Sequence, residues 1–225
     1  MWLDPIAFSQ WLKLRDKFGV RELIETGTYH GTGAAFYAHY FERVDSCEKN
    51  AEAYALARNR TAHIKNLYLY NQSSPAFLFD YKTWYMTCNR QDTVLFFLDA
   101  HWANDWPILE ELKALKDLPN CVVIIHDFKV EGLGYISRDG QPLDLDFVRR
   151  DLKTINPGFS LYTNSREWTA LYTRDEILKH PAAIVDTYTE DGVLFAWSAE
   201  RRKYRGMLYA VPEKLDSSFL LKEVA

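Results

Sequence analysis

The sequence predicts an α/β fold with a doubly wound, mostly parallel sheet, and three observations predict it. Short apolar runs alternate with capped, helix-like segments from the N-terminus to about residue 125. Residues 93–98 and 121–125 are apolar almost throughout, as strands buried on both faces are. A glycine-rich turn follows the first apolar run, where such folds pass from strand to helix.

The expected elements follow from periodicity, caps and turn residues. Asp4-Pro5 has the pattern of an N-cap and a first-turn proline, and Gly19 is typical of a helix end. This leading helix, within residues 1–19, either packs on the sheet or covers the functional site. Core strands are expected at residues 21–26, 43–47, 66–70, 93–98 and 121–125. Further helices are expected at about 32–41, after Asn50, from Ser74-Pro75 to about 86, from Asp105 to about 115, and at about 146–155.

The C-terminal part is harder to interpret. Residues 159–162, 168–172 and 206–211 all look like strands, and two of them should form an antiparallel hairpin that brings the sheet to seven strands. Either 168–172 or 207–211 is the last core strand, so the segment from residue 175 is an insertion or an appendage. Residues 1–225 are expected to form one domain with its core in 20–165. Residues 128–143 form a loop or small hairpin, which is either a substrate lid or a simple connector.

Composition excludes several classes of function. The chain has 225 residues and a formal charge of −4, which gives no basic surface for nucleic acid. Three scattered cysteines fit a reducing compartment better than a disulfide scaffold. No apolar stretch approaches the roughly 18 residues of a membrane span, and no signal-type segment opens the chain. A cytoplasmic protein without a membrane or nucleic-acid partner is therefore expected.

The glycine-rich turn predicts a site for a nucleoside cofactor. Its frame is Glu-x-Gly-x-x-x-Gly-x-Gly, which differs from the Gly-x-Gly-x-x-Gly spacing of dinucleotide oxidoreductases. The acid Glu25 precedes the first glycine, Gly27, and would repel a pyrophosphate. A carboxylate suits a ligand with a cationic amino group, and S-adenosylmethionine carries an ammonium and a sulfonium but no phosphate.

Two further strand ends extend this prediction. Glu48 follows the second strand, where an acid accepts hydrogen bonds from both ribose hydroxyls in nucleoside-binding folds. Gln72 or Ser73, after the third strand, is a candidate for the adenine edge. A solvated charge at Glu48 and simple helix capping by Ser74 are the alternatives.

The chain resembles class I S-adenosylmethionine-dependent methyltransferases, and in particular the small-molecule and sugar O-methyltransferase branch that includes the macrocin O-methyltransferase type. The resemblance covers about residues 20–128 well, 129–165 loosely and the remainder poorly. It rests on Glu25-Thr26-Gly27 with Gly31, on Cys47-Glu48-Lys49, on Leu98-Asp99-Ala100-His101-Trp102, and on Ile125-His126-Asp127-Phe128.

The resemblance implies roles for these residues. Glu25 and Gly27 would hold the methionine end of the cofactor, Gly31 would allow the close turn, and Glu48 would bind the ribose. The cofactor-binding set implied in full is Glu25, Gly27, Tyr29, Gly31, Glu48, Ser73 and Asp99. In the metal-dependent branch, acids at the fourth and fifth strand ends hold Mg²⁺, and Asp99 and Asp127 stand there. Relatives commonly have another acid or amide beside the last one, whereas this chain has His126 and Phe128.

The implied function is methyl transfer to an oxygen of a small molecule or sugar, assisted by Mg²⁺ in the metal-dependent case. Such a transfer needs an aligned acceptor and a group that removes its proton. His101 is the expected base, with Asp99 beside it, and His30 is a weaker candidate. Trp102, Trp106 and Tyr135 would wall a ring-shaped acceptor or serve only in packing. The alternatives are an NAD-dependent oxidoreductase and a non-catalytic relative that binds a glycan or a protein. A homo-oligomer is possible.

Overall fold

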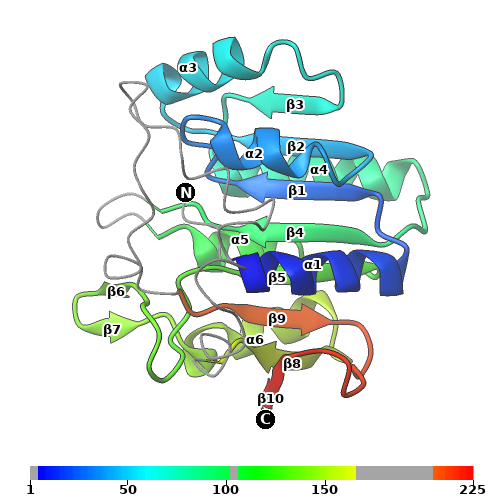
Figure 1. Cartoon of the computed structure of the whole chain (residues 1–225), viewed down its shortest axis with the longest axis vertical. Helices are drawn as coiled ribbons and strands as arrows, with labels where there is room; N and C mark the ends of the chain where they lie inside the picture. Colours follow the sequence, from blue (N-terminus) through cyan, green and yellow to red (C-terminus); the bar gives the residue numbers. More distant parts are fainter. Residues whose placement is uncertain (1–4, 102–105, 166–204, 225) are drawn as a thin grey trace.

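The structure is a computed structural model that describes residues 5–101, 106–165 and 205–224 (Figure 1). Trp102, Asp105 and the segment 168–172, all of which entered the sequence predictions, lie outside the described residues. Among the described helices, none is both long and apolar enough to cross a membrane.

The core is one mixed sheet whose central strands are parallel (Figure 1). The five expected core strands are present in the order β3-β2-β1-β4-β5, all parallel to their neighbours. Their bounds are Glu22–Thr26 for β1, Arg43–Cys47 for β2, Leu67–Tyr70 for β3, Val94–Leu98 for β4 and Cys121–Ile125 for β5. Their carboxyl ends meet at one edge of the sheet, which is the left edge in Figure 1.

The C-terminal strands complete the sheet beyond β5. Strand β9, Leu208–Val211, pairs antiparallel with β5 and with β8, Ser160–Thr163. The last core strand is therefore in the 207–211 region, and the expected antiparallel hairpin pairs it with the 159–162 region. The expected total of seven strands is wrong for the described residues, because β10, Lys222–Val224, adds an eighth along β8. This strand is short and mostly exposed, so it lacks the apolar pattern that would reveal it.

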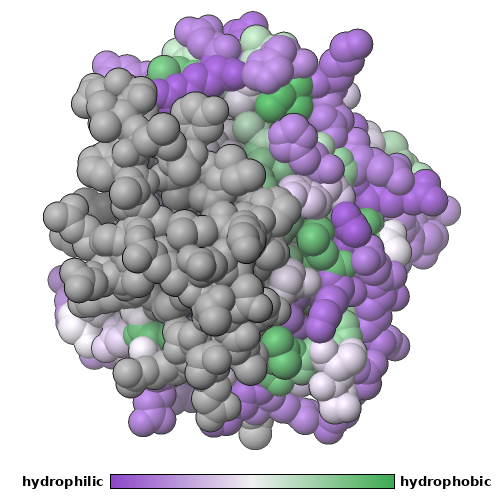
Figure 2. Space-filling model, in the orientation of Figure 1, coloured by the Kyte–Doolittle hydropathy of each residue, from purple (hydrophilic) through white to green (hydrophobic). Residues whose placement is uncertain are grey.

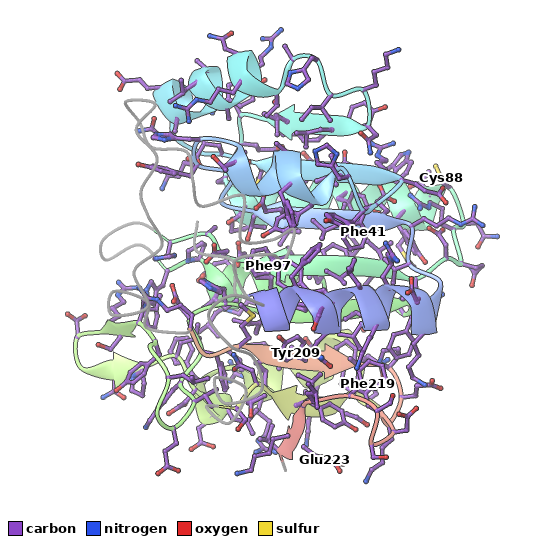
Figure 3. All side chains as sticks on the ribbon, in the orientation of Figure 1. Phe41, Cys88, Phe97, Tyr209, Phe219 and Glu223 are labelled. Carbon is purple, nitrogen blue, oxygen red and sulfur yellow. The ribbon has the colours of Figure 1, made fainter. Side chains whose placement is uncertain are left out.

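Helices α1 (Pro5–Phe18) and α2 (Thr32–Tyr37) cover one face of the sheet. Trp11 of α1 packs on Phe97 of β4 with ring centroids 4.4 Å apart, and it also contacts Tyr37 of α2. Figure 3 shows Phe97 and Tyr209 from separate strands on the side that α1 covers. Gly19 ends α1 in a left-handed conformation (φ +62°), as its sequence position predicts.

Helices α4 (Ser74–Thr87), α5 (Ile108–Ala114) and α6 (Leu145–Ile155) cover the opposite face. Alternate residues of β4 and β5 supply this second core, because successive strand side chains point to opposite faces. Helix α3 (Ala51–Thr61) lies alongside β3, and its expected N-cap Asn50 accepts hydrogen bonds from two backbone N–H groups. The described part of the surface in Figure 2 is largely hydrophilic over α3, with hydrophobic residues as separate spots elsewhere.

The segment 128–143 forms a small hairpin. Strands β6 (Ser137–Arg138) and β7 (Gln141–Pro142) are joined by Asp139 and Gly140, both at positive φ, as expected of a tight hairpin turn. The amide of Ile136 donates to the Asp127 carbonyl at 3.1 Å, and Lys129 donates to Leu143 at 2.7 Å. These bonds hold the hairpin against the carboxyl end of β5.

Candidate active site

The register of the parallel strands aligns the residues that follow them. Thr26 pairs with Cys47 on one side and with Leu98 on the other, and Leu98 pairs with Ile125. The next residues of these strands therefore lie side by side at one edge, where open α/β sheets bind ligands. They are Glu48, Gly27, Asp99 and His126, in that order across the sheet.

Gly27 is required by a close approach between the ends of β1 and β4. Its φ is +84°, and a Cβ at this position would lie 2.9 Å from the Asp99 carbonyl oxygen and 3.0 Å from the Ala100 Cα. The sequence suggests a glycine that admits a ligand, but the nearest neighbour is protein backbone. The Gly27 N–H is also used, since it donates to the Cys47 carbonyl at 3.0 Å.

Gly31 has a comparable structural reason. Its φ is +80°, and a Cβ there would lie 3.0 Å from the Ala57 Cβ on α3. The Gly31 N–H donates to the Thr28 carbonyl at 2.9 Å and closes the turn before α2. The predicted tight turn is thus present, and α3 sets how closely it packs.

Glu48 is bound to the glycine-rich turn. Its Oε2 accepts a hydrogen bond from the Tyr29 N–H at 2.8 Å, and its Oε1 accepts one from the Asn50 N–H at 2.8 Å. The side chain is half-buried, and each carboxylate oxygen still has a lone pair available for a ligand hydroxyl. Tyr29 itself is at positive φ, and its ring stacks on the His30 ring with the two ring centroids 3.7 Å apart.

Glu25 lies beneath this turn and is fully buried. Its Oε2 accepts from the Ser46 hydroxyl at 2.6 Å, and Ser46 in turn contacts the Thr28 hydroxyl at 2.5 Å. Burial raises the pKa of Glu25 to about 8, and the hydrogen bond from Ser46 opposes this rise. Oε1 has no hydrogen-bond partner among the described residues, which is unusual for a buried carboxylate.

The turn after β3 meets Glu48 from the other side. The Asn71 side-chain amide donates to the Glu48 carbonyl at 2.8 Å, and the Gln72 N–H donates to the same oxygen at 3.2 Å. Helix α4 begins at Ser74 rather than after it, with Ser73 in the N-cap position and no side-chain cap bond. The expected capping role of Ser74 is therefore wrong. Ser73 is half-buried beside this turn.

The imidazole of His126 lies between the acids at the ends of β4 and β5. Its Nδ1 is 2.7 Å from Asp99 Oδ1 and 3.5 Å from Asp127 Oδ2. Burial lowers the pKa of His126, but attraction to Asp99 and Asp127 outweighs it and raises the pKa to about 10. Nε2 of His126 is buried without a hydrogen-bond partner in the described structure.

Asp127 is surrounded by nitrogen atoms. His101 Nε2 is 3.5 Å from its Oδ2, and Arg205 Nη1 is 3.0 Å from its Oδ1. Burial raises the pKa of Asp127, but His126, Arg205 and His101 together hold it below the ordinary value. Asp127 has φ +54°, a left-handed conformation that is uncommon for a residue other than glycine and is often found at functional sites.

Arg205 reaches Asp127 because a buried amide fixes its backbone. Asn164 donates to the Arg205 carbonyl at 2.8 Å and accepts from the Met207 N–H at 2.8 Å. The adjacent Gly206 donates to the Gly134 carbonyl at 2.8 Å, so it crosses the base of the 128–143 segment. The sequence prediction missed Arg205, since no local pattern connects it with a residue almost eighty positions earlier.

A small cavity lies at this edge between α5 and the hairpin. Asp99, His101 and Asp127 contribute polar groups to it, and Trp106, Ile136 and Leu143 contribute apolar ones. Glu111 of α5 also lines it and was not singled out by the sequence. Tyr135, expected as part of an aromatic wall, is exposed, and His30 stacks on Tyr29 in the glycine-rich turn.

The acids also form a candidate cation site. Asp99, His101 and Asp127 each offer one ligand atom, and these atoms lie within 4.8 Å of one another. Two carboxylates and an imidazole are a suitable donor set for a divalent cation, although Mg²⁺ prefers oxygen donors alone. Arg205 and His126 already balance part of the carboxylate charge.

Comparison with known proteins relates the chain to methyltransferases at the level of the fold. No protein-family model matches it, and no curated protein sequence matches it. A proposed sarcosine dimethylglycine methyltransferase from Galdieria sulphuraria is 15% identical, with 94% of this chain and 92% of that chain covered and a TM-score of 0.51. The plantazolicin methyltransferase BamL, solved with S-adenosylhomocysteine, is 11% identical, with coverage of 93% and 85% and a TM-score of 0.50.

A proposed caffeoyl-CoA O-methyltransferase from Staphylococcus aureus is also 11% identical, with coverage of 94% and 85% and a TM-score of 0.50. The chain therefore has the Rossmann-like α/β fold of these methyltransferases, with antiparallel strands at its C-terminal end. The acceptors in the three names differ, and a shared fold does not by itself identify a substrate.

Proposed function

We propose that the chain is an S-adenosylmethionine-dependent methyltransferase that methylates an oxygen atom of a small molecule or sugar. The observation that carries this proposal is the hydrogen bond from the Tyr29 N–H to Glu48. It couples the acid after β2 to the glycine-rich turn after β1. A nucleoside over this edge would therefore meet both groups together, in the manner general to open α/β sheets.

In this proposal the cofactor lies across the ends of β1, β2 and β4. Its ammonium lies towards Glu25, whose Oε1 lacks a partner among the described residues, and its ribose hydroxyls lie against Glu48. Gly27 and Gly31 keep the turn compact, and Tyr29 and Ser73 lie beside the ribose and the adenine. Asp99, at the end of β4, is the last of the proposed cofactor-binding residues.

The same features argue against an NAD-dependent oxidoreductase. Glu48 lies directly beside the glycine-rich turn, so a pyrophosphate bound there would face its carboxylate. The Gly27 N–H, which would be available to a phosphate in a nucleotide-binding turn, already donates to Cys47.

His101 is the proposed general base. It is partly exposed at the cavity, and its Nε2 lies 3.5 Å from Asp127, which would stabilise the imidazolium formed when it takes the acceptor's proton. S-adenosylmethionine supplies an electrophilic methyl group on a sulfonium. Asp99 would orient the acceptor hydroxyl, while Trp106, Ile136 and Leu143 exclude water around it.

We also propose that Asp99 and Asp127 hold a divalent cation such as Mg²⁺. The donor set fits one, because Asp99, His101 and Asp127 offer ligand atoms within 4.8 Å of one another, although Oδ1 of Asp127 is paired with Arg205 at 3.0 Å. A cation there would lower the effective pKa of an acceptor hydroxyl. In this arrangement the Arg205 guanidinium either keeps its ion pair with Asp127 beside the cation or gives that ion pair up. His101 does not bind the cation and is free to accept a proton.

The test is methyl transfer from S-adenosylmethionine labelled in its methyl group to a panel of catechols, sugars and other hydroxyl compounds. Formation of S-adenosylhomocysteine together with a labelled ether supports the proposal. Quenching of protein fluorescence by NADH, without binding of S-adenosylhomocysteine, would instead favour the oxidoreductase. Cofactor binding without turnover on any acceptor would favour a non-catalytic glycan- or protein-binding relative.

A further inference from the structure

Asn164 is a buried amide that binds the backbone of the segment before β9. It directly follows β8, and its relative exposure is 1%. Its Nδ2 donates to the Arg205 carbonyl at 2.8 Å, and its Oδ1 accepts from the Met207 N–H at 2.8 Å. A buried side-chain amide is unfavourable unless both of its ends are hydrogen-bonded. Both ends of Asn164 are used, and they fix residues 205–207 against the end of β8.

Gly206, in the middle of this fixed segment, binds the hairpin within residues 128–143. Since Asn164 uses the backbone groups on either side of Gly206, those of Gly206 itself are left for another partner. The Gly206 N–H donates to the Gly134 carbonyl at 2.8 Å, and the Gly206 carbonyl accepts from the Phe128 N–H at 2.9 Å. A Cβ at Gly206 would lie 2.0 Å from the Phe128 carbonyl oxygen, so this close approach requires a glycine.

The hairpin held in this way forms one wall of the cavity at the carboxyl edge of the sheet. Ile136 and Leu143 of the hairpin segment line that cavity. The fixed segment also carries Arg205, whose Nη1 lies 3.0 Å from Asp127 Oδ1. The Asp127 carbonyl in turn accepts from the Ile136 N–H at 3.1 Å. Asn164 is therefore connected both to the apolar wall of the cavity and to its acid.

We propose that Asn164 is a positioning residue for the acceptor. It acts through Gly206 on the hairpin, and through Arg205 on the Asp127 carboxylate. This inference rests on the proposed function, because it assumes that an acceptor binds in this cavity. Asn164 is not among the described residues that line the cavity, so its effect is indirect. The proposed cofactor lies across the ends of β1, β2 and β4, whereas Asn164 acts on segments beyond β5, so cofactor binding should not depend on it.

Asn164→Leu and Gly206→Ala disturb this connection from its two ends. Leucine has a similar size but neither hydrogen-bonding group, and a methyl group at Gly206 forces the Phe128 carbonyl away. Asn164→Asp is the milder variant. It keeps an oxygen for the Met207 N–H and replaces only the group that donates to the next carbonyl.

Asn156→Leu is the matched control. Asn156 also accepts a backbone N–H, from Gly158 at 2.8 Å, but it lies at the C-terminal end of α6, whereas the hairpin precedes the N-terminal end of that helix. The quantities measured are kcat/KM for an acceptor that the wild type methylates, the calorimetric affinity for S-adenosylhomocysteine, and the hydrogen exchange of backbone amides in residues 128–143. Hydrogen exchange needs neither cofactor nor acceptor, so it reports on the hairpin separately from the reaction.

In Asn164→Leu and in Gly206→Ala, kcat/KM for the acceptor should fall by about tenfold or more, because a displaced wall misaligns the acceptor hydroxyl. The affinity for S-adenosylhomocysteine should stay near that of the wild type. The Phe128 and Ile136 amides should exchange about tenfold faster or more, since their hydrogen bonds lie in the loosened segment. Asn164→Asp should change these quantities in the same direction by less, and Asn156→Leu should match the wild type.

The double variant Asn164→Leu with Gly206→Ala should be no worse than the weaker single variant, because both substitutions break one connection. Wild-type kcat/KM in Asn164→Leu would overturn the inference and leave the proposed function intact. So would a loss of affinity for S-adenosylhomocysteine as large as the loss of kcat/KM, because the substitution would then disturb the whole site.

If Asn164→Leu does not fold, the same criteria apply to Asn164→Asp. If the wild type transfers no methyl group, the proposed function fails first, and the inference falls with it whatever the hydrogen exchange shows.

Discussion

Nδ1 of His126 lies 2.7 Å from Oδ1 of Asp99, across the ends of two adjacent parallel strands. The two residues follow Ile125 and Leu98, which are paired in register. The sheet therefore brings an imidazole between the two acids Asp99 and Asp127. The carboxylates of this edge are held close together without mutual repulsion, because positively charged side chains separate them.

Removal of the Asp127 carboxylate should weaken cation binding. Asp127→Asn removes the negative charge of a carboxylate that would bind the cation. It also leaves the positive charge of Arg205 without its partner at the site, so the affinity for Mg²⁺ or Mn²⁺ should fall by about tenfold or more. Calorimetry with the metal chloride, after treatment with EDTA, measures this directly. Asp139→Asn, at the exposed hairpin turn, is the control. Equal affinity in both variants, or activity insensitive to EDTA, would remove the metal from the mechanism.

Loss of the proposed base should reduce turnover without weakening cofactor binding. His101→Ala should lower the rate of methyl transfer by about 100-fold or more, which is the usual contribution of a positioned base. Its affinity for S-adenosylhomocysteine should stay near that of the wild type. His63→Ala, at an exposed position that follows α3 in the chain, should leave both quantities unchanged. A His101→Ala enzyme with wild-type turnover would exclude this role.

A methyl group at Gly27 should destabilise the fold more than one at Gly140. The two glycines have similar φ values, +84° and +77°, so alanine is strained at both by about 1–2 kcal/mol. A Cβ meets the Asp99 carbonyl at 2.9 Å in the first case and nothing within 4 Å in the second. Urea unfolding should show an extra loss of about 1–3 kcal/mol for Gly27→Ala. Equal losses would mean that the approach of β1 to β4 is not tight.

Stability should fall as the pH rises towards 8, in part because of Glu25. Its folded pKa of about 8 lies above the ordinary value of 4.5, so between these values the folded state binds one more proton than the unfolded state. Each such carboxyl lowers the free energy of unfolding by up to about 1.4 kcal/mol per pH unit in that window. Glu25→Gln should therefore become more stable relative to the wild type between pH 5 and 8. A difference that stays constant with pH would contradict the raised pKa.

The sequence is most informative where local patterns decide the structure. Apolar runs mark the five parallel strands, and an acid that closes such a run must lie at the carboxyl edge of the sheet. Glu48 and Asp99 are therefore predictable from strand order alone, and parallel pairing then places them on either side of Gly27 at the same edge. Gly19 and Asn50 end and begin helices as their residue types indicate.

The remaining features depend on contacts between distant segments. The φ of Gly27 is a local property, but its close approach to Asp99 requires the placement of β4. Arg205 reaches Asp127 through a backbone fixed by Asn164 and Gly134. Glu111 carries one usable signal, its spacing with Ile108 and Leu112 on the inner face of a helix, where an acid is out of place.

Calorimetric titration with S-adenosylhomocysteine, on the wild type and on Glu48→Ala, tests the central claim most directly. The Glu48→Ala variant would lack the charge-assisted hydrogen bonds that Glu48 makes to the ribose, so it should bind about 10- to 100-fold more weakly than the wild type. Glu52→Ala, exposed in the first turn of α3, should bind as the wild type does. No binding to the wild type at millimolar ligand, or equal binding by Glu48→Ala, would contradict a nucleoside cofactor at this edge of the sheet.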